Sequence, residues 1–275
     1  MKSRFHVLAV VLAAAIALML AVPAAHADSR NVVVVAHRGA TMSKYAEGTL
    51  RAYRYAVRHH ADLLDADIRW TKDGPDRDSV GTMIILHDAR LDRITNCKGP
   101  ISGWLWPAVR AKCRTEVGGQ RLMRLVDLLR YGNSRGKSFT LEIKLPSITD
   151  AQAEQFWNTV KNSRVQLVAR AARIASLNKI KKLDEGDVSH QISYAFSTRG
   201  SDRWPSVSTI KKTATVVYAK VTIPIAVARR YRHANLKVFL STGKNKADYA
   251  KMMRRKPYAV VVDNVARFQR WRAKQ

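Results

Sequence analysis

Two histidines that each follow an apolar run are the residues best suited to acid–base chemistry. His37 follows Val32–Ala36, which has the pattern of a strand buried on both faces, and His87 follows Met83–Leu86. Histidine changes its charge near neutral pH, so a pair can take a proton from one group and give one to another. Parallel α/β proteins build their sites at the carboxyl ends of strands, which predicts one shared reaction centre.

Carboxylates and cations occur at the same kind of position. Asp65 and Asp67 alternate in one strand-like run, Glu142 and Lys144 alternate in another, and Arg38 stands beside the first histidine. Side chains two residues apart share a face of a strand, so these pairs would point into a barrel, where unpaired charge is costly. A metal ion or a phosphate would offset that cost. Three carboxylates form an all-oxygen set that suits Mg²⁺ or Ca²⁺ rather than zinc.

The first 27 residues have the pattern of a secretory signal peptide. Lys2 and Arg4 precede an apolar stretch from 7 to 21, and Ala25–Ala27 is a small-x-small cleavage site. The apolar stretch is short for a membrane span. We therefore expect cleavage and a secreted, extracellular protein comprising residues 28–275.

The remaining chain alternates strand-like and helix-like segments, which is typical of a (β/α)8 TIM barrel. It matches the ~250 residues usual for such a domain, and no linker divides it. The expected strands are 32–35, 63–68, 83–87, 138–144, 192–196, 215–219, 238–240 and 259–262. The expected helices are one capped by Thr49 and those near 125–131, 151–175, 204–212, 224–233, 246–255 and 264–273.

A polar segment at about 95–120, after the third expected strand, is too long for an ordinary connection. We expect it to be a small insertion over the barrel mouth. It holds both cysteines, Cys97 and Cys113, and two tryptophans, Trp104 and Trp106. In an oxidising compartment a disulfide is the simplest interpretation, and its loop would contribute about 3 kcal/mol in the chain-entropy model.

The chain is strongly basic, with a formal net charge of +28. Removal of Lys2 and Arg4 with the signal peptide would leave about +26. The cations are scattered, so they form either a plain soluble surface or one that concentrates the protein near anionic membranes or wall polymers. No nucleic-acid motif is present, so a specific nucleic acid is not expected. A monomer is favoured, although sequence leaves the oligomeric state open.

Seven motifs in order resemble the glycerophosphodiester phosphodiesterase family, within the phosphatidylinositol-phosphodiesterase-like TIM barrel superfamily. They read His37-Arg38-Gly39, Glu47-Gly48-Thr49-Leu50, Asp65-Ala66-Asp67, Thr71-Lys72-Asp73-Gly74, His87-Asp88, Leu91-Asp92-Arg93-Ile94-Thr95 and Leu141-Glu142-Ile143-Lys144. The resemblance is dense from Val32 to Lys144 and weaker beyond, where Val261-Val262-Asp263 is similar to the family's closing strand.

This resemblance implies a barrel whose mouth binds one divalent cation, Mg²⁺ or Ca²⁺. By motif position, the resemblance implies that Asp65, Asp67 and Glu142 are the metal ligands. It implies that His37 and His87 are the general base and acid, and that Arg38 and Lys144 contact the phosphate. It implies that the Glu47 carboxylate orders the first loop.

Three positions depart from the family pattern. Asp65 stands where glutamate is usual and is shorter by one methylene, which could shift the ion, admit a water or leave Asp65 away from it. Gly48 replaces the usual asparagine, and Leu240 stands where tryptophan is common. None of these changes removes an acid, a base or a phosphate contact.

The function expected from the resemblance is a secreted, metal-dependent phosphodiesterase that hydrolyses glycerophosphodiesters to glycerol 3-phosphate and an alcohol. Its nucleophile is either water or a neighbouring substrate hydroxyl. One alternative is a phospholipase D-like enzyme of the sphingomyelinase D kind, acting on intact lipids. The other is a non-catalytic binder of anionic wall polymer, against which the full set of site residues argues.

Overall fold

The structure is a computed structural model that describes residues 31–72, 80–171, 173–185, 192–198 and 204–275. The expected signal peptide, residues 1–27, lies outside the described residues, as do Asp73 and Gly74 of the fourth motif. Within the described ranges, no helix is both long and apolar enough to cross a membrane.

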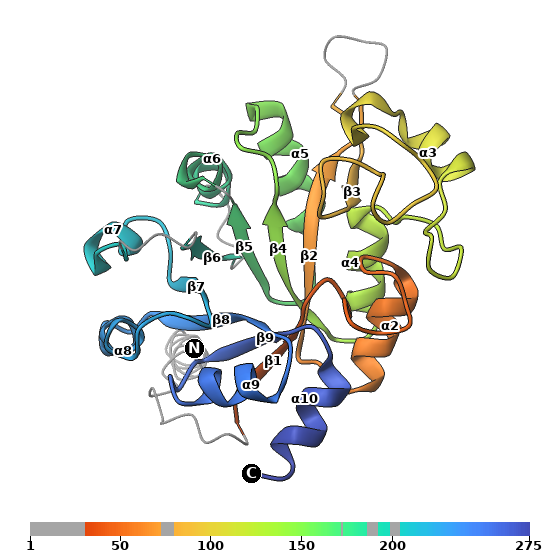
Figure 1. The fold of residues 1–275 in the computed structure, drawn as a ribbon. Coiled ribbons are helices and arrows are strands. Elements are labelled where there is room, and N and C mark those ends of the chain that lie inside the picture. The colour runs from red at the N-terminus through yellow and green to blue at the C-terminus, as the bar shows by residue number, and fades with distance from the viewer. Residues whose placement is uncertain (1–30, 73–79, 172, 186–191, 199–203) are drawn as a thin grey trace, which may run out of the picture.

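Eight parallel strands close into a barrel with helices around it (Figure 1). Closure comes from β1, which pairs with β2 on one side and with β9 on the other. The barrel strands are β1 (Val33–Ala36), β2 (Leu63–Trp70), β4 (Ser138–Ile143), β5 (Leu167–Ala171), β6 (Ile192–Ser197), β7 (Val216–Lys220), β8 (Lys237–Gly243) and β9 (Ala259–Val262). The (β/α)8 fold expected from the sequence is therefore confirmed.

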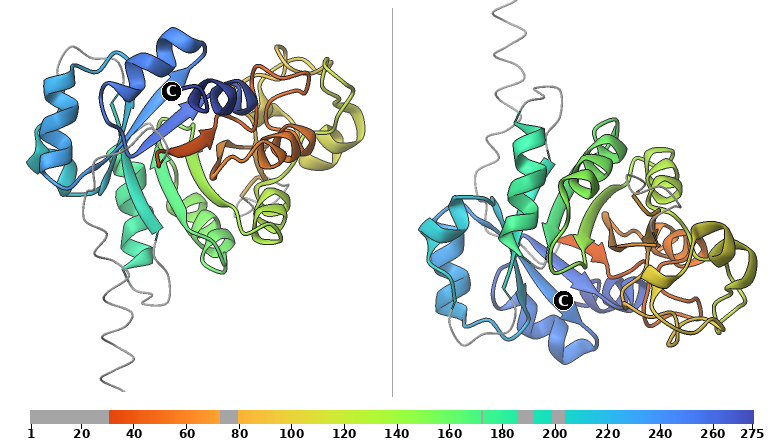
Figure 2. Two further views of the ribbon diagram at one scale, coloured as in Figure 1. Left: turned by 90° about the horizontal axis from the view of Figure 1, so that it is seen from below. Right: turned by 90° about the horizontal axis from the view of Figure 1, so that it is seen from above.

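Helices connect these strands and cover the outside of the barrel, except α3 and a 3₁₀ turn, which belong to the insertion (Figures 1 and 2). They are α2 (Leu50–Arg58), α3 (Trp106–Lys112), α4 (Leu125–Asn133), α5 (Asp150–Val160), α6 (Ile174–Asp184), α7 (Val207–Lys211), α8 (Ile225–His233), α9 (Lys246–Met253) and α10 (Val265–Arg272), with a 3₁₀ turn η1 at Ile101–Gly103. The Thr49 hydroxyl caps α2 by accepting a hydrogen bond from the Ala52 backbone N–H, as expected.

Two of the expected elements were wrong. The sequence predicts the third barrel strand at 83–87, but β3 (Met83–Ile85) pairs antiparallel with β2 and lies outside the barrel wall. The sequence predicts one helix over 151–175, but α5 ends at Val160 and the barrel strand β5 follows. Neither Gly nor Pro interrupts that segment, and its apolar residues happen to fit a helical spacing, so the local signal for the break is weak.

The interior of the barrel changes from apolar to charged along its strands. Alternate residues, including Val35, Val168, Val216 and Phe239, form a small apolar core inside the wall. The other strand face packs against the helices in a much larger core. At the carboxyl ends the inward residues become polar, so the apolar layer supports the charged one.

The insertion lies to one side of the barrel, away from α6, α7 and α8, in all three views (Figures 1 and 2). Because β3 is not a barrel strand, the insertion follows the second barrel strand rather than the third. It has a small core of its own, in which Cys97 and Cys113 are buried and joined by a disulfide with Cα atoms 5.4 Å apart. The disulfide expected from the sequence is confirmed.

Candidate active site

Neighbouring strands place acidic and basic side chains in one layer of the barrel. Asp67 on β2 is in register with Glu142 on β4, and Glu142 is in register with Arg170 on β5. Asp65 on β2 is likewise in register with Thr140 on β4, two residues earlier along each strand. Because residues in register lie side by side across a parallel sheet, these five side chains must interact.

Asp65 is completely buried, with each carboxylate oxygen satisfied. Its Oδ1 accepts hydrogen bonds from the Thr140 hydroxyl at 2.5 Å and from Arg170 Nη2 at 2.8 Å. Its Oδ2 accepts one from the Arg38 backbone N–H at 3.3 Å. Burial by itself would raise the pKa of Asp65, but the charges of Arg170 and His37 and the hydrogen bonds from Thr140 and Arg170 outweigh it and lower this pKa to about 2.

Glu142 and Asp67 share the ammonium group of Lys144. Lys144 Nζ lies 3.2 Å from Glu142 Oε1 and 3.5 Å from Asp67 Oδ1, and Arg170 Nη1 donates to the other Glu142 oxygen. Burial and the neighbouring carboxylates raise the pKa of Asp67, whereas the cations lower that of Glu142. The sequence-predicted residues on β2 and β4 therefore lie together.

Arg38 is held in an unusual backbone conformation at the end of β1. Its φ is +51°, in the left-handed region that L-residues other than glycine rarely adopt. The side chain forms an ion pair with Asp67, Nε to Oδ2 at 3.0 Å, and donates from Nη1 to Glu47 at 3.1 Å. This conformation turns the guanidinium across the barrel mouth, where it contacts both carboxylates.

His37 is oriented by a carboxylate at the end of the last barrel strand. Its Nδ1 lies 2.5 Å from Asp263 Oδ1, and this pair leaves Nε2 free of protein partners among the hydrogen bonds of the described residues. The His37 side chain is 17% exposed, so it remains accessible from the mouth. The nearby histidine also lowers the pKa of Asp263, which keeps that carboxylate charged.

His87 belongs to a chain of paired groups that reaches back to Arg38. His87 Nδ1 lies 2.6 Å from Asp88 Oδ1, and Arg93 joins Asp88 to Glu47. Burial lowers the pKa of His87, while its hydrogen bond to Asp88 acts in the opposite direction. Glu47 thus connects the first loop, through Arg93 and Asp88, to the second histidine.

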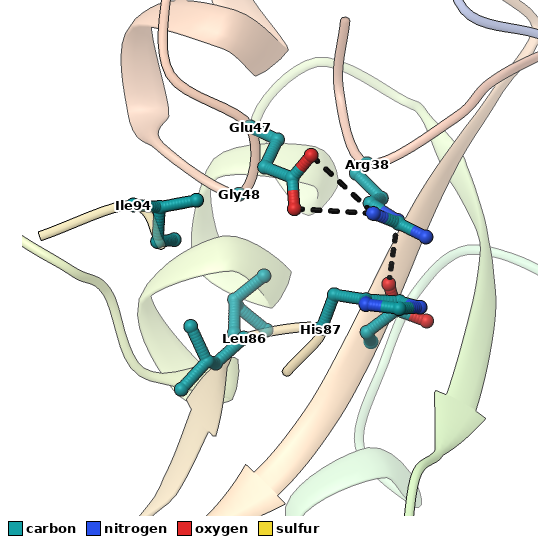
Figure 3. Close-up of a pocket in the computed structure, with 8 residues that line it drawn as sticks. Arg38, Glu47, Gly48, Leu86, His87 and Ile94 are labelled. Atoms are coloured by element: carbon teal, nitrogen blue, oxygen red, sulfur yellow. Dashed lines mark hydrogen bonds and ion pairs between the residues drawn. The ribbon is translucent and has the colours of Figure 1, made fainter. Parts of the chain in front are cut away.

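A small pocket opens between these groups. It is lined by Arg38, Glu47, Gly48, Asp67, Ile85, Leu86, His87 and Ile94. Figure 3 shows the Glu47 carboxylate directed at the Arg38 guanidinium, with the His87 ring facing the same space. The pocket therefore presents a cation and an imidazole beside an apolar wall.

A family model for the glycerophosphoryl diester phosphodiesterase family matches residues 37–267, which includes every barrel strand after β1. The chain belongs to this family. The match includes all the candidate residues of the barrel mouth named above.

Curated and solved relatives agree with this membership. A glycerophosphodiester phosphodiesterase of Bacillus subtilis is 25% identical over 175 residues, which span 56% of this chain and 56% of that protein. The chain thus aligns with about half the length of that curated relative.

Solved structures share the fold at lower identity. A phosphodiesterase of Oleispira antarctica, in complex with the product sn-glycerol-3-phosphate, is 16% identical with a TM-score of 0.75, covering 88% of this chain and 97% of that one. A glycerophosphodiester phosphodiesterase of Thermotoga maritima is 20% identical with a TM-score of 0.68, covering 87% and 97% respectively.

Two residues for which the sequence predicts no role are central in this family member. Asp263 was recognised only as part of the closing strand, and its contact with His37 depends on the pairing of β1 with β9. Arg170 was placed in a helix, because the signal for β5 was masked by helical spacing. A lone arginine in the apolar run Leu167–Ala171 was the available clue.

Members of the glycerophosphoryl diester phosphodiesterase family generally depend on a divalent metal. Within the described ranges, no three His, Cys, Asp or Glu side chains are arranged to hold a metal ion. Asp65 has each oxygen occupied by a protein donor, and both oxygens of Glu142 contact cationic side chains. As they stand, these residues do not fit Mg²⁺ or Ca²⁺.

Proposed function

We propose that this protein hydrolyses glycerophosphodiesters to glycerol 3-phosphate and an alcohol. The observation that carries the proposal is the pair of imidazoles at one barrel mouth, each bound through Nδ1 to a carboxylate, beside two cations. A carboxylate at Nδ1 sets the tautomer and orientation of a histidine and directs Nε2 toward the substrate. Membership of the family and the product complex of the Oleispira relative support this substrate class.

The proposed reaction needs two proton transfers. One imidazole takes a proton from the attacking oxygen, which belongs to water or to a neighbouring hydroxyl of the substrate. The new P–O bond forms as the bond to the alcohol breaks, and the other imidazole gives a proton to the leaving alkoxide. His37 and His87 are the groups proposed for these two roles.

Cationic side chains are proposed to stabilise the charge that develops on phosphorus-bound oxygens. Arg38 lines the pocket, and Lys144 lies in the adjacent carboxylate layer. Groups already fixed by ion pairs need little reorganisation during the reaction, which favours electrostatic stabilisation. Because the carboxylates do not fit a divalent cation, no step of this mechanism passes through a metal ion.

A panel of phosphodiesters tests the proposal. Purified protein is incubated with glycerophosphocholine, glycerophosphoethanolamine, glycerophosphoglycerol, sphingomyelin vesicles and wall teichoic acid, and the products are separated. Release of glycerol 3-phosphate from the small diesters supports the proposal. Exclusive cleavage of intact lipid favours the phospholipase D-like alternative, and binding of wall polymer without any product favours a non-catalytic role.

Secretion is a separate proposal, supported by the charge and apolar pattern of residues 1–27. Expression of the full chain in a bacterial host, followed by N-terminal sequencing of protein recovered from the medium, should find a mature chain that begins at Asp28. Retention of Met1 on protein confined to the cell would contradict this proposal.

A further inference from the structure

Arg170 occupies the centre of the charged layer. It reaches from β5 across β4, where Nη2 contacts Asp65 at 2.8 Å and Nη1 donates to Glu142. Its guanidinium stacks on the Tyr218 ring, with 4.1 Å between the Arg170 Cζ atom and the ring centroid. The side chain is 7% exposed, so it interacts with protein groups rather than with a substrate.

We propose that the guanidinium of Arg170 supplies the positive charge between Asp65 and Glu142, and that this protein therefore works without a resident divalent cation. The inference rests on the proposed phosphodiesterase function and concerns the same site. It assigns Arg170 a positioning role, because this residue acts through Glu142 and the groups that Glu142 holds.

The first argument is the occupation of the carboxylate oxygens. A divalent cation bound by Asp65 would have to displace Arg170 Nη2, the Thr140 hydroxyl or the Arg38 backbone N–H. The Thr140 hydroxyl and Arg170 Nη2 would remain buried if displaced, because Thr140 is fully buried and Arg170 nearly so. Leaving buried donors without acceptors is costly, so the cluster as built resists a metal ion.

The second argument is charge balance in a buried layer. Each of the three carboxylates already contacts a cation: Asp65 contacts Arg170, Asp67 contacts Arg38 and Lys144, and Glu142 contacts Arg170 and Lys144. Three anions are thus matched by three cations. A further double positive charge would have no counterion here, and uncompensated buried charge is unfavourable.

The third argument is side-chain size. The acid at position 65 is aspartate, whose side chain is one methylene shorter than that of glutamate. A guanidinium is larger than a metal ion and presents a planar fork of donors that matches carboxylates. The short side chain of Asp65 leaves space in the layer, and the guanidinium of Arg170 from β5 fills that space.

Arg170 also explains how the phosphate-binding groups stay ordered. By holding one oxygen of Glu142, it leaves Oε1 to contact Lys144 Nζ at 3.2 Å. Lys144 in turn contacts Asp67, the partner of Arg38. The guanidinium thus positions both proposed phosphate contacts through intervening carboxylates.

Metal binding by the unmodified protein gives the first test. Protein purified without chelator is assayed for bound metals by elemental analysis, and its melting temperature is followed in Mg²⁺, Ca²⁺ and Mn²⁺. We expect substoichiometric metal, no cation-dependent rise in melting temperature, and turnover of glycerophosphodiesters that persists in chelator. One retained equivalent of a divalent ion, or turnover abolished by chelator and restored by that ion, would overturn the proposal.

The variant Arg170→Ser gives the second test, because it leaves the carboxylates with one cation fewer. Its turnover should fall about 10²-fold, because Glu142 and Lys144 lose the group that positions them, and Ca²⁺ or Mn²⁺ should now raise its melting temperature. Arg170→Lys, which retains a positive charge, should fold and stay insensitive to divalent ions. Arg124→Ser removes an arginine that pairs with Asp127 beside α4 and is the matched control.

The thermal and elemental measurements do not depend on turnover. If the unmodified protein cleaves none of the diesters, the proposed function fails, while its metal content still decides the role of Arg170. A divalent ion that stabilises the unmodified protein and Arg170→Ser equally would overturn the proposal even if the enzyme is active. The same holds if Arg170→Lys acquires a dependence on divalent ions.

Discussion

Each imidazole at the barrel mouth has one nitrogen committed to a carboxylate, which makes the two residues a functional unit. We expect His37→Ala and His87→Ala each to reduce kcat by about 10²–10⁴-fold, and the double variant to lose little more than the worse single one. Steady-state kinetics on glycerophosphocholine measures both effects. His233→Ala, an exposed histidine at the end of α8, is the control.

Strict additivity of the two single effects would show that the histidines act independently. Near-normal turnover in either single variant would remove that residue from the proposed mechanism.

Asp88 sets the pH at which His87 titrates. Its hydrogen bond to the imidazole raises the pKa of His87 against the lowering caused by burial. In Asp88→Asn that support is lost, so the pKa of His87 should fall further. The limb of the kcat/KM profile that reports His87 should therefore move to lower pH, whichever proton transfer this residue performs. A profile that stays in place, or moves to higher pH, would contradict this assignment.

Sequence reasoning located many of the groups that meet at the mouth, because they end runs whose burial is evident from composition. Arg38, Asp67 and His87 line one pocket, as a shared reaction centre requires. Arg170 could not be predicted, because the apolar residues around it fit a helical period. In a helix, nothing indicates that its side chain points into the barrel. Asp263 depends on a pairing between chain ends that no local pattern encodes.

At the level of elements, the direction in which a strand pairs with its neighbour was harder to predict than whether the strand is buried. The apolar run Met83–Ile85 has the composition of a barrel strand, but β3 pairs antiparallel to β2 and introduces the insertion. A short buried strand shows no alternation from which its partner could be inferred. The barrel still emerged as the fold class, because the alternation of strands and helices along the whole chain is stronger evidence than any one element.

The disulfide should stabilise the insertion rather than the barrel. Cys97 and Cys113 belong to a small separate core that also contains Leu91, Ile101 and Val109. Reduction should make the segment between the cysteines sensitive to protease, while the far-UV circular dichroism of the barrel changes little. Cys97→Ser with Cys113→Ser should behave like the reduced protein without any reductant. Cooperative loss of the whole fold on reduction would contradict this separation.

At the scale of the whole molecule, a formal charge of about +26 after the expected removal of Lys2 and Arg4 should act on binding rather than on chemistry. Exposed charges are screened beyond ~8 Å at physiological salt, whereas Arg38 and Lys144 are mostly buried in ion pairs. Added salt should therefore weaken binding to anionic vesicles steeply and leave turnover of a small diester nearly unchanged. Vesicle co-sedimentation and kinetics over a salt series measure the two effects.

A surface variant isolates the contribution of charge to that binding. Lys251, Arg254 and Lys256 are exposed, whereas Arg255 donates to the backbone oxygens of Ile223 and Lys251 and is better left unchanged. Substitution of the three exposed cations by glutamine should reduce vesicle binding with normal turnover. Salt-insensitive binding, or turnover that falls in parallel with binding, would contradict the prediction.

The closure of the barrel also makes catalysis depend on synthesis of the last barrel strand. His37 and Asp263 are 226 positions apart and meet only when β1 pairs with β9. Contacts this distant along the chain form slowly, because a large loop must close first. A nascent chain that has not yet produced β9 holds neither a closed wall nor an oriented His37, so incomplete or prematurely ended chains should have no activity against the cell's own phosphodiesters.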